Sequence, residues 1–195
     1  MRGPLLSGPL GSSSVLDALL VRLRGAGKTE GKTEGKTERK TDRKTAVIGP
    51  LWLGETLAAE IPVVLLIEPE ERGRARRVAR RAVAAGRRLT VVVAGVELPL
   101  LPGTTDALVI ESAAALQPEE LARWTAALVP ALKPGGLLIA ADVTDDPAVE
   151  ARLAGQFLGA ALIGIAQDRP RDGVVLTIGT APAAALVKAR FQAAS

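Results

Sequence analysis

The sequence contains no cysteine, no histidine and no tyrosine, and aromatic residues make up only 2% of it. Without cysteine no disulfide can form, and metal sites built from cysteine or histidine are excluded, so we expect no metal. Catalytic arrangements that pair histidine with serine or cysteine are excluded as well. Any catalysis must use carboxylates, hydroxyls, lysine, arginine, backbone groups or a cofactor that brings its own reactivity.

The chain also lacks a long apolar run. No stretch reaches the roughly 18 apolar residues that a membrane span requires. The N-terminal sequence MRGPLLSGPLGSSS is interrupted by glycine and proline and lacks the continuous apolar core of a secretory signal. We therefore expect a cytoplasmic protein with no membrane partner, and a length of 195 residues is typical of a single domain.

Positive charge is concentrated in one segment of the chain. Residues 27–45 repeat a Lys-Thr-Glu/Asp unit and account for +3 of the formal net charge of +4. The repeat has no apolar residue to bury, which predicts a disordered segment between an N-terminal segment with a helix, 1–26, and a main domain, 46–195. An electrostatic tether and a tolerated surface expansion are both open roles for it. The nearly neutral remainder and the few aromatic residues argue against a nucleic-acid partner.

From residue 46 onward, apolar runs alternate with helical patterns, which is typical of an α/β protein with a mostly parallel sheet. Strands are expected at 46–48, 63–67, 89–93, 107–110 and 137–141. Two further strands, 161–166 and 174–179, flank a polar turn over 167–173 and predict a C-terminal hairpin. Helices are expected before residue 25, from the end of a loop over 49–54 to residue 60, and over 70–85, 118–132, 147–158 and 183–191.

The helix over 70–85 has an apolar stripe surrounded by arginine. Residues at helical spacing predict an inward face consisting of Ala75, Val78, Ala79, Ala82 and Val83. Six arginines cover the remaining surface: Arg72, Arg74, Arg76, Arg77, Arg80 and Arg81. They are compatible with contact to RNA or a membrane, but a solvated face, partly offset by nearby glutamates, is the interpretation favoured by the general behaviour of charge runs.

The segment from Asp106 to Val143 contains a buried strand, a helix, a Lys-Pro-Gly-Gly turn and a second buried strand. The sequence of this segment resembles that of the fourth and fifth strands of class I S-adenosylmethionine-dependent methyltransferases and of the helix between them. The resemblance covers about residues 46–180. It implies a Rossmann-like sheet of five parallel strands plus a C-terminal β-hairpin with one antiparallel strand, and helices on both faces.

The resemblance also implies a place for the cofactor, S-adenosylmethionine, at the carboxyl ends of the strands. Its glycine loop corresponds to Gly49 and Gly54, its ribose-binding acid to Glu68, and its adenine-binding segment to Gly95 and Glu97. The chain departs from the family pattern at four positions on this side. These positions are Ile48, Pro50, Trp52 and Val96.

After the fourth strand, where the family often places residues that face the substrate, the chain has Glu111 and Ser112. Glu111 is the candidate base, and Asp142 after the fifth strand is a weaker candidate. The resemblance implies methyl transfer to a small-molecule or protein substrate. The alternative is a catalytically inactive pseudoenzyme that keeps the fold for binding, with the hairpin edge open to a second copy or a protein partner. Phosphate-binding glycine loops of other nucleotide-binding folds are missing.

Overall fold

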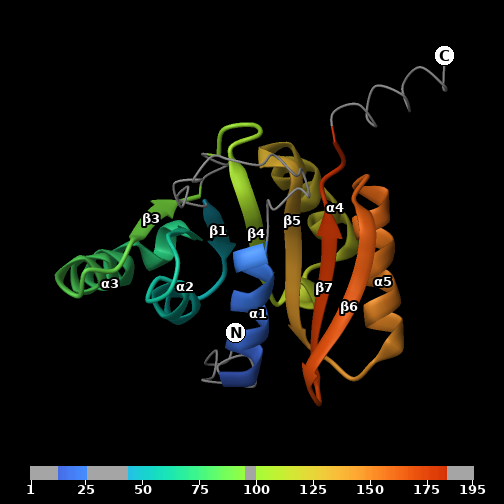
Figure 1. The fold of residues 1–195 in the computed structure, drawn as a ribbon, viewed down its shortest axis with the longest axis horizontal. Coiled ribbons are helices and arrows are strands. Elements are labelled where there is room, and N and C mark those ends of the chain that lie inside the picture. Colours follow the sequence, from blue (N-terminus) through green and yellow to red (C-terminus); the bar gives the residue numbers. More distant parts are fainter. Residues whose placement is uncertain (1–12, 26–43, 95–99, 184–195) are drawn as a thin grey trace, which may run out of the picture.

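A computed structural model describes residues 13–25, 44–94 and 100–183 of the chain. These residues form one seven-stranded sheet with helices on both faces (Figure 1). Most of the Lys-Thr-Glu repeat and of the helix predicted at 183–191 lie outside the described residues. The predicted division at 26 and 45 therefore stays a prediction.

Five parallel strands and a two-stranded C-terminal hairpin, which contributes one antiparallel strand, make up the sheet, and this confirms the fold class predicted from the sequence. The strand order is β3-β2-β1-β4-β5-β7-β6, with β1 to β5 parallel and β7 antiparallel to both of its neighbours. The strands are β1 (Thr45–Ile48), β2 (Val63–Ile67), β3 (Leu89–Val93), β4 (Thr105–Glu111), β5 (Leu132–Val143), β6 (Ile163–Arg171) and β7 (Val174–Thr180).

Two groups of helices cover the two faces (Figure 1). The first group is α1 (Ser13–Gly25), α2 (Leu51–Leu57) and α3 (Arg72–Ala84). The second is α4 (Pro118–Leu128) and α5 (Pro147–Gly159), and short 3₁₀ turns lie at η2 (Pro69–Glu71), η3 (Ala113–Ala115) and η4 (Val129–Ala131). No helix in the described ranges combines the length and the apolar composition that crossing a membrane requires.

The central strands are apolar throughout because both of their faces are covered. In β4, Ala107 and Val109 pack toward α1, α2 and α3, whereas Leu108 and Ile110 pack toward α4 and α5. This alternation divides the core into two layers. Since the larger aliphatic side chains fill both layers, a core with very few aromatic residues is sufficient.

Helix α1 is an integral part of the first layer. Val15, Leu19 and Leu23 are at most 2% exposed and belong to the same cluster as the inner residues of β1, β4 and β7. An ion pair between Arg22 and Asp168 joins α1 to β6 at the surface. The N-terminal helix thus packs on the sheet although residues 26–44 separate it from β1 in the sequence.

Three local sequence interpretations were wrong. The loop predicted over 49–54 consists of only two residues, because α2 already begins at Leu51. Val83, expected to face inward, is 70% exposed, because α3 approaches β3 only through its stripe of Ala75, Val78 and Ala82. The hairpin loop predicted over 167–173 is much shorter, since β6 continues to Arg171 and pairs there with Val174. The turn is Asp172-Gly173, and Gly173 has φ +73°, which is the conformation that Asp-Gly hairpin turns favour.

The Lys-Pro-Gly-Gly segment lies at the amino end of β5, where it fixes the β4–β5 pairing. Lys133 Nζ lies 2.7 Å from Asp106 Oδ1, and the Lys44 backbone N–H donates to Asp106 Oδ2 at 2.8 Å. Gly135 has φ +78°. A Cβ on Gly136 would lie 2.9 Å from the Lys133 carbonyl oxygen, so the close approach of the backbone requires glycine there. The motif that carries the family resemblance is therefore structural.

Gly136→Ala should destabilise the protein because its Cβ meets backbone oxygens that cannot move aside cheaply. We expect a loss of about 1–3 kcal/mol in the free energy of unfolding, measured by urea denaturation. Gly155→Ala is the matched control, since this helical glycine of α5 has open space around its Cβ position. The control should gain about 0.5–1 kcal/mol. Equal effects of the two substitutions would contradict the packing argument.

Candidate functional site

The carboxyl ends of the parallel strands bring the candidate residues to one edge of the sheet. Ile48 of β1 pairs with Leu66 of β2 and with Ile110 of β4, so the residues that follow these strands lie side by side. After β1 the chain forms β2 and β3 on one side of β1, and it then forms β4 and β5 on the other side of β1. This edge is therefore the topological switch point, where open α/β sheets bind their ligands.

The loop between β1 and α2 consists of only Gly49 and Pro50. A Cβ on Gly49 would lie 2.8 Å from the Cβ of Glu111, so glycine is needed because β4 passes close by. Pro50 is the N-cap of α2, with φ −68°, and provides no backbone N–H. The loop thus keeps a close approach at Gly49 but has one donor fewer than a glycine loop.

Gly54 and Trp52 have separate roles in packing α2. A Cβ on Gly54 would lie 2.8 Å from both Cδ atoms of Leu65, so this glycine lets α2 pack closely on β2. That is the role of the last glycine in a dinucleotide-binding loop. Trp52 is partly buried and packs against the core layer that contains α1.

Glu68 directly follows β2, at the N-cap position of η2, and is exposed. It therefore occupies the edge next to the β1–α2 loop, where the resemblance places the ribose-binding acid. Gly95, Val96 and Glu97, the predicted adenine-binding segment and its departure from the family pattern, lie outside the described residues. Their assignment stays a prediction.

Glu111 ends β4 and is half-buried beside Gly49. Burial raises the pKa of its carboxyl group, and a hydrogen bond from the Ser112 side chain partly offsets that effect. Ser112 has left-handed backbone angles, φ 57° and ψ 39°, and its N–H donates to the Ala141 carbonyl at 2.9 Å. A non-glycine residue in this conformation costs about 1–3 kcal/mol, and such strain is concentrated at functional sites.

Asp142 of β5 is 1% exposed. Burial raises its pKa from 3.8 to about 6. The hydrogen bond from the Ala114 N–H, 2.6 Å from Oδ1, lowers this pKa, the charge of Glu111 raises it, and the charge of Arg152 lowers it. The second oxygen, Oδ2, accepts no hydrogen bond from any of the described residues. Such a group is costly to keep ionised.

Arg152 extends from α5 to the same turn. It donates to the carbonyl of Ala114 at 2.7 Å and to that of Leu116 at 3.2 Å. Asp142 and Arg152 therefore hold the turn after β4 from two sides, and this turn presents Glu111 and Ser112. Nothing in the sequence indicated Arg152, because an arginine within an amphipathic helix gives no local signal that it will bind backbone carbonyls far along the chain.

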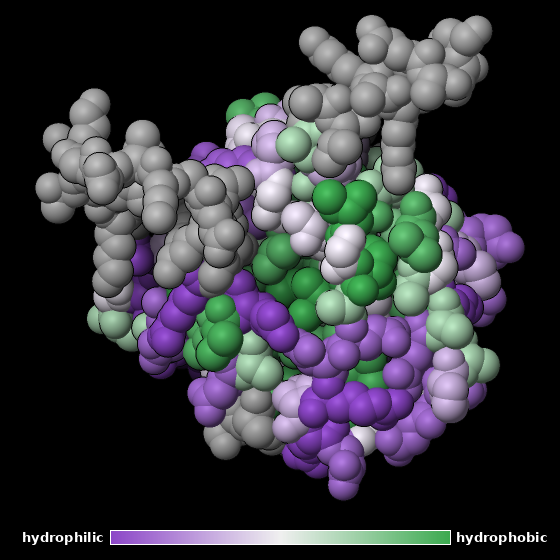
Figure 2. Space-filling view, turned by 45° about the vertical axis from the view of Figure 1, so that its right-hand side comes forward, coloured by the Kyte–Doolittle hydropathy of each residue, from purple (hydrophilic) through white to green (hydrophobic). Residues whose placement is uncertain are grey.

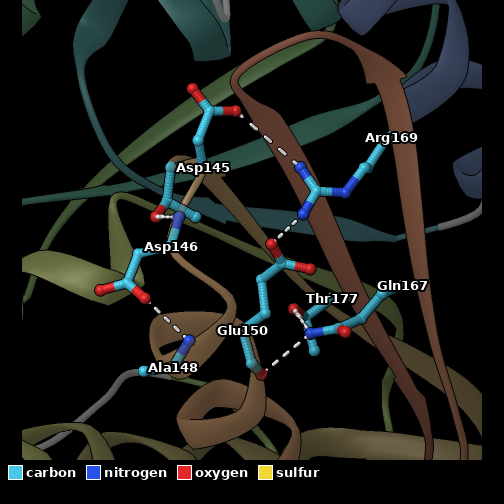
Figure 3. A network of polar contacts seen from close by, with 8 residues as sticks. Asp145, Asp146, Ala148, Glu150, Gln167, Arg169 and Thr177 are labelled. Atoms are coloured by element: carbon cyan, nitrogen blue, oxygen red, sulfur yellow. Dashed lines mark hydrogen bonds and ion pairs between the residues drawn. The ribbon is translucent and has the colours of Figure 1, made fainter.

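Figure 3 shows a polar network that fixes the start of α5, the helix to which Arg152 belongs. Asp146 accepts from the Ala148 N–H at 2.8 Å and caps the helix. Arg169 of β6 forms an ion pair with Glu150 and lies 4.0 Å from Asp145. The network joins the hairpin to the loop that follows β5.

Comparison with known proteins shows which fold this is. No family model matches the sequence, and no curated protein matches it. Solved structures of S-adenosylmethionine-dependent methyltransferases match the fold: SibL in its apo form has a TM-score of 0.60 and 16% identity, over 73% of this chain and 51% of that one. PigF, solved with SAH, has a TM-score of 0.58 and 16% identity, over 71% and 50%. An O-methyltransferase family protein from Burkholderia thailandensis has a TM-score of 0.58 and 15% identity, over 88% and 57%.

These similarities establish a methyltransferase-like Rossmann fold. The chain spans about half the length of the first two solved structures that it matches. At such low identity the likeness concerns the fold alone, and the chemistry has to be argued from this chain's own residues.

Asp142→Asn should remove a pH dependence of stability. Because the pKa of Asp142 is raised in the folded protein, its contribution to stability is present below about pH 4 and is lost as the pH rises through about 6. That loss amounts to at most about 3 kcal/mol. The free energy of unfolding of the unaltered protein, minus that of the variant, should fall between about pH 3.5 and 6.5 in urea titrations. A difference independent of pH would contradict the burial of an ionisable Asp142.

Proposed function

We propose that this chain binds S-adenosylmethionine at the carboxyl edge of its sheet and transfers the methyl group to a small-molecule or protein acceptor. One observation carries the proposal. At the switch point of a methyltransferase-like fold, the Gly49 loop lies against Glu111, and Glu68 directly follows the neighbouring strand β2. The roles that the proposal gives to these residues are the ones that the sequence resemblance implies.

In this proposal the chain's own residues hold the cofactor. Glu68 accepts hydrogen bonds from the two ribose hydroxyls, an interaction that its acceptor oxygens and its exposure at the end of β2 favour. The absence of a side chain at Gly49 allows β4 and the β1–α2 loop to lie together. Gly54 brings α2 close to β2, and Gly95 and Glu97 are the proposed adenine contacts.

The cofactor supplies an electrophilic methyl group on its sulfonium, so the protein mainly has to align the acceptor and remove a proton. Glu111 is the group proposed to accept that proton, since burial raises its pKa toward the range in which a carboxylate acts as a base. The Ser112 side chain orients the Glu111 carboxyl group by its hydrogen bond. Asp142 is enclosed by the turn and holds it in place.

A second candidate is a protein that keeps the fold without catalysis. The observation in its favour is the loop itself, in which Pro50 provides no donor and Glu111 already occupies the space next to Gly49. Both candidates predict the same fold, and they differ in whether the cofactor binds.

Calorimetric titration with S-adenosylmethionine distinguishes the two. We expect binding in the micromolar range, and Glu68→Ala should weaken it by about 10- to 100-fold, because hydrogen bonds to a charged group contribute about 1.5–3 kcal/mol. Glu70→Ala is the matched control, since Glu70 is also exposed and lies two residues further along, in η2. The control should bind as the unaltered protein does.

Lack of heat and of any thermal shift at millimolar cofactor would favour the inactive protein. Binding that survives Glu68→Ala unchanged would leave a cofactor site but place it elsewhere. A bound protein in which Glu111→Gln lowers methyl transfer while cofactor affinity is unchanged would support the proposed base.

A further inference from the structure

The arginines of α3 line a groove on the outside of the molecule. The arginine groove has a volume of about 540 Å³ and is lined by Leu51, Arg74, Arg77, Val78, Arg80 and Arg81. Helix α3 lies at one end of the molecule, beyond α2 and away from α4 and α5 (Figure 1). The face shown in Figure 2 differs from the arginine groove in composition. Hydrophobic residues gather in the middle of that face, and hydrophilic residues lie below them.

Few acidic side chains offset this charge. Arg81 lies 3.2 Å from Glu55, and this is the ion pair that the groove's arginines form within the described ranges. Glu70 and Glu71 belong to η2, before α3 begins, and not to the lining of the groove. All six arginines of α3 are exposed, as the sequence interpretation of a solvated face predicted, and four of them line one groove.

The arginines repel one another. Arg74, Arg77 and Arg81 follow at spacings of three and four residues, so they are neighbours on one helix face, where like charges are destabilising. An anion placed along the row would relieve this repulsion at several positions at once. The planar guanidinium group also matches phosphate and carboxylate oxygens in pairs, which a lysine cannot do.

The lining favours phosphates over a protein surface. Protein interfaces are centred on aromatic or aliphatic anchors, whereas on the outer side of α3 the exposed large apolar side chain is Val83. A nucleic-acid backbone needs only positive charge, and contacts to it carry no sequence information. One row of arginines on a single helix face can contact the phosphates of one nucleic-acid strand.

We propose that the arginine groove binds the phosphate backbone of a single-stranded nucleic acid without sequence preference. The scarcity of aromatic residues argues against nucleic-acid binding by stacked bases, but contact with the phosphate backbone does not need aromatic side chains. The groove adjoins the candidate site, because Leu51 directly follows Pro50. Binding of nucleic acid to the arginine groove does not require the proposed cofactor site.

Fluorescence anisotropy of the full chain with a labelled single-stranded RNA of about 20 nucleotides tests the proposal. We expect a dissociation constant on the order of 10 μM at low salt, with a slope of about −3 in log affinity against log salt for four phosphate contacts. Arg77→Gln combined with Arg80→Gln should reduce the slope to about −1.4 and weaken binding at least about tenfold.

The matched control is Arg123→Gln combined with Arg171→Gln, which removes the same charge at exposed sites on α4 and β6. It should retain the slope and the affinity of the unaltered protein, and circular dichroism should show all three proteins equally folded. Equal weakening in both double variants would overturn the proposal, because binding would then follow net charge. Displacement of the RNA by polyglutamate of equal charge would overturn it in favour of an acidic protein partner.

Discussion

Parallel pairing of β1 with β4, in which Ile48 lies opposite Ile110, determines where everything else at the candidate site can lie. It brings the short β1–α2 loop against the end of β4, close enough that a Cβ on Gly49 would collide with Glu111. A bulkier residue at position 49 would push the two strand ends apart. The pairing also separates β2 and β3 from β5, which creates the switch point that the proposed cofactor would span.

The two edges of the sheet have different tasks. At the amino edge, Asp106 joins the backbone of Lys44 to the side chain of Lys133 and fixes how β4 and β5 start. At the carboxyl edge, Asp142 and Arg152 hold the strained turn after β4. The contacts at the amino edge explain why the Lys-Pro-Gly-Gly sequence accompanies this fold. They give no information about catalysis. Evidence on activity has to come from the second edge.

The central strands of the sheet were predictable because they are covered on both faces and therefore appear as unbroken apolar runs. Glu111 was named from the family resemblance, as a residue that follows the fourth strand; it ends β4 in the structure, and its role stays a prediction. Arg152 was not, since its partners are backbone carbonyls far along the chain, and only the folded structure brings them together. The inward face of α3 was predicted one residue too wide at Val83, because periodicity gives a stripe's direction better than its width.

Hydrogen–deuterium exchange with and without S-adenosylhomocysteine tests the central claim, a cofactor site at the carboxyl edge, most directly. Our account predicts slower exchange in the peptides that cover the β1–α2 loop after Gly49 and the end of β2 at Glu68, and unchanged exchange around Lys133 at the opposite edge. Ligand binding orders the backbone that it contacts, so protection should be confined to that edge. Unchanged exchange in both peptides at saturating ligand would contradict the account.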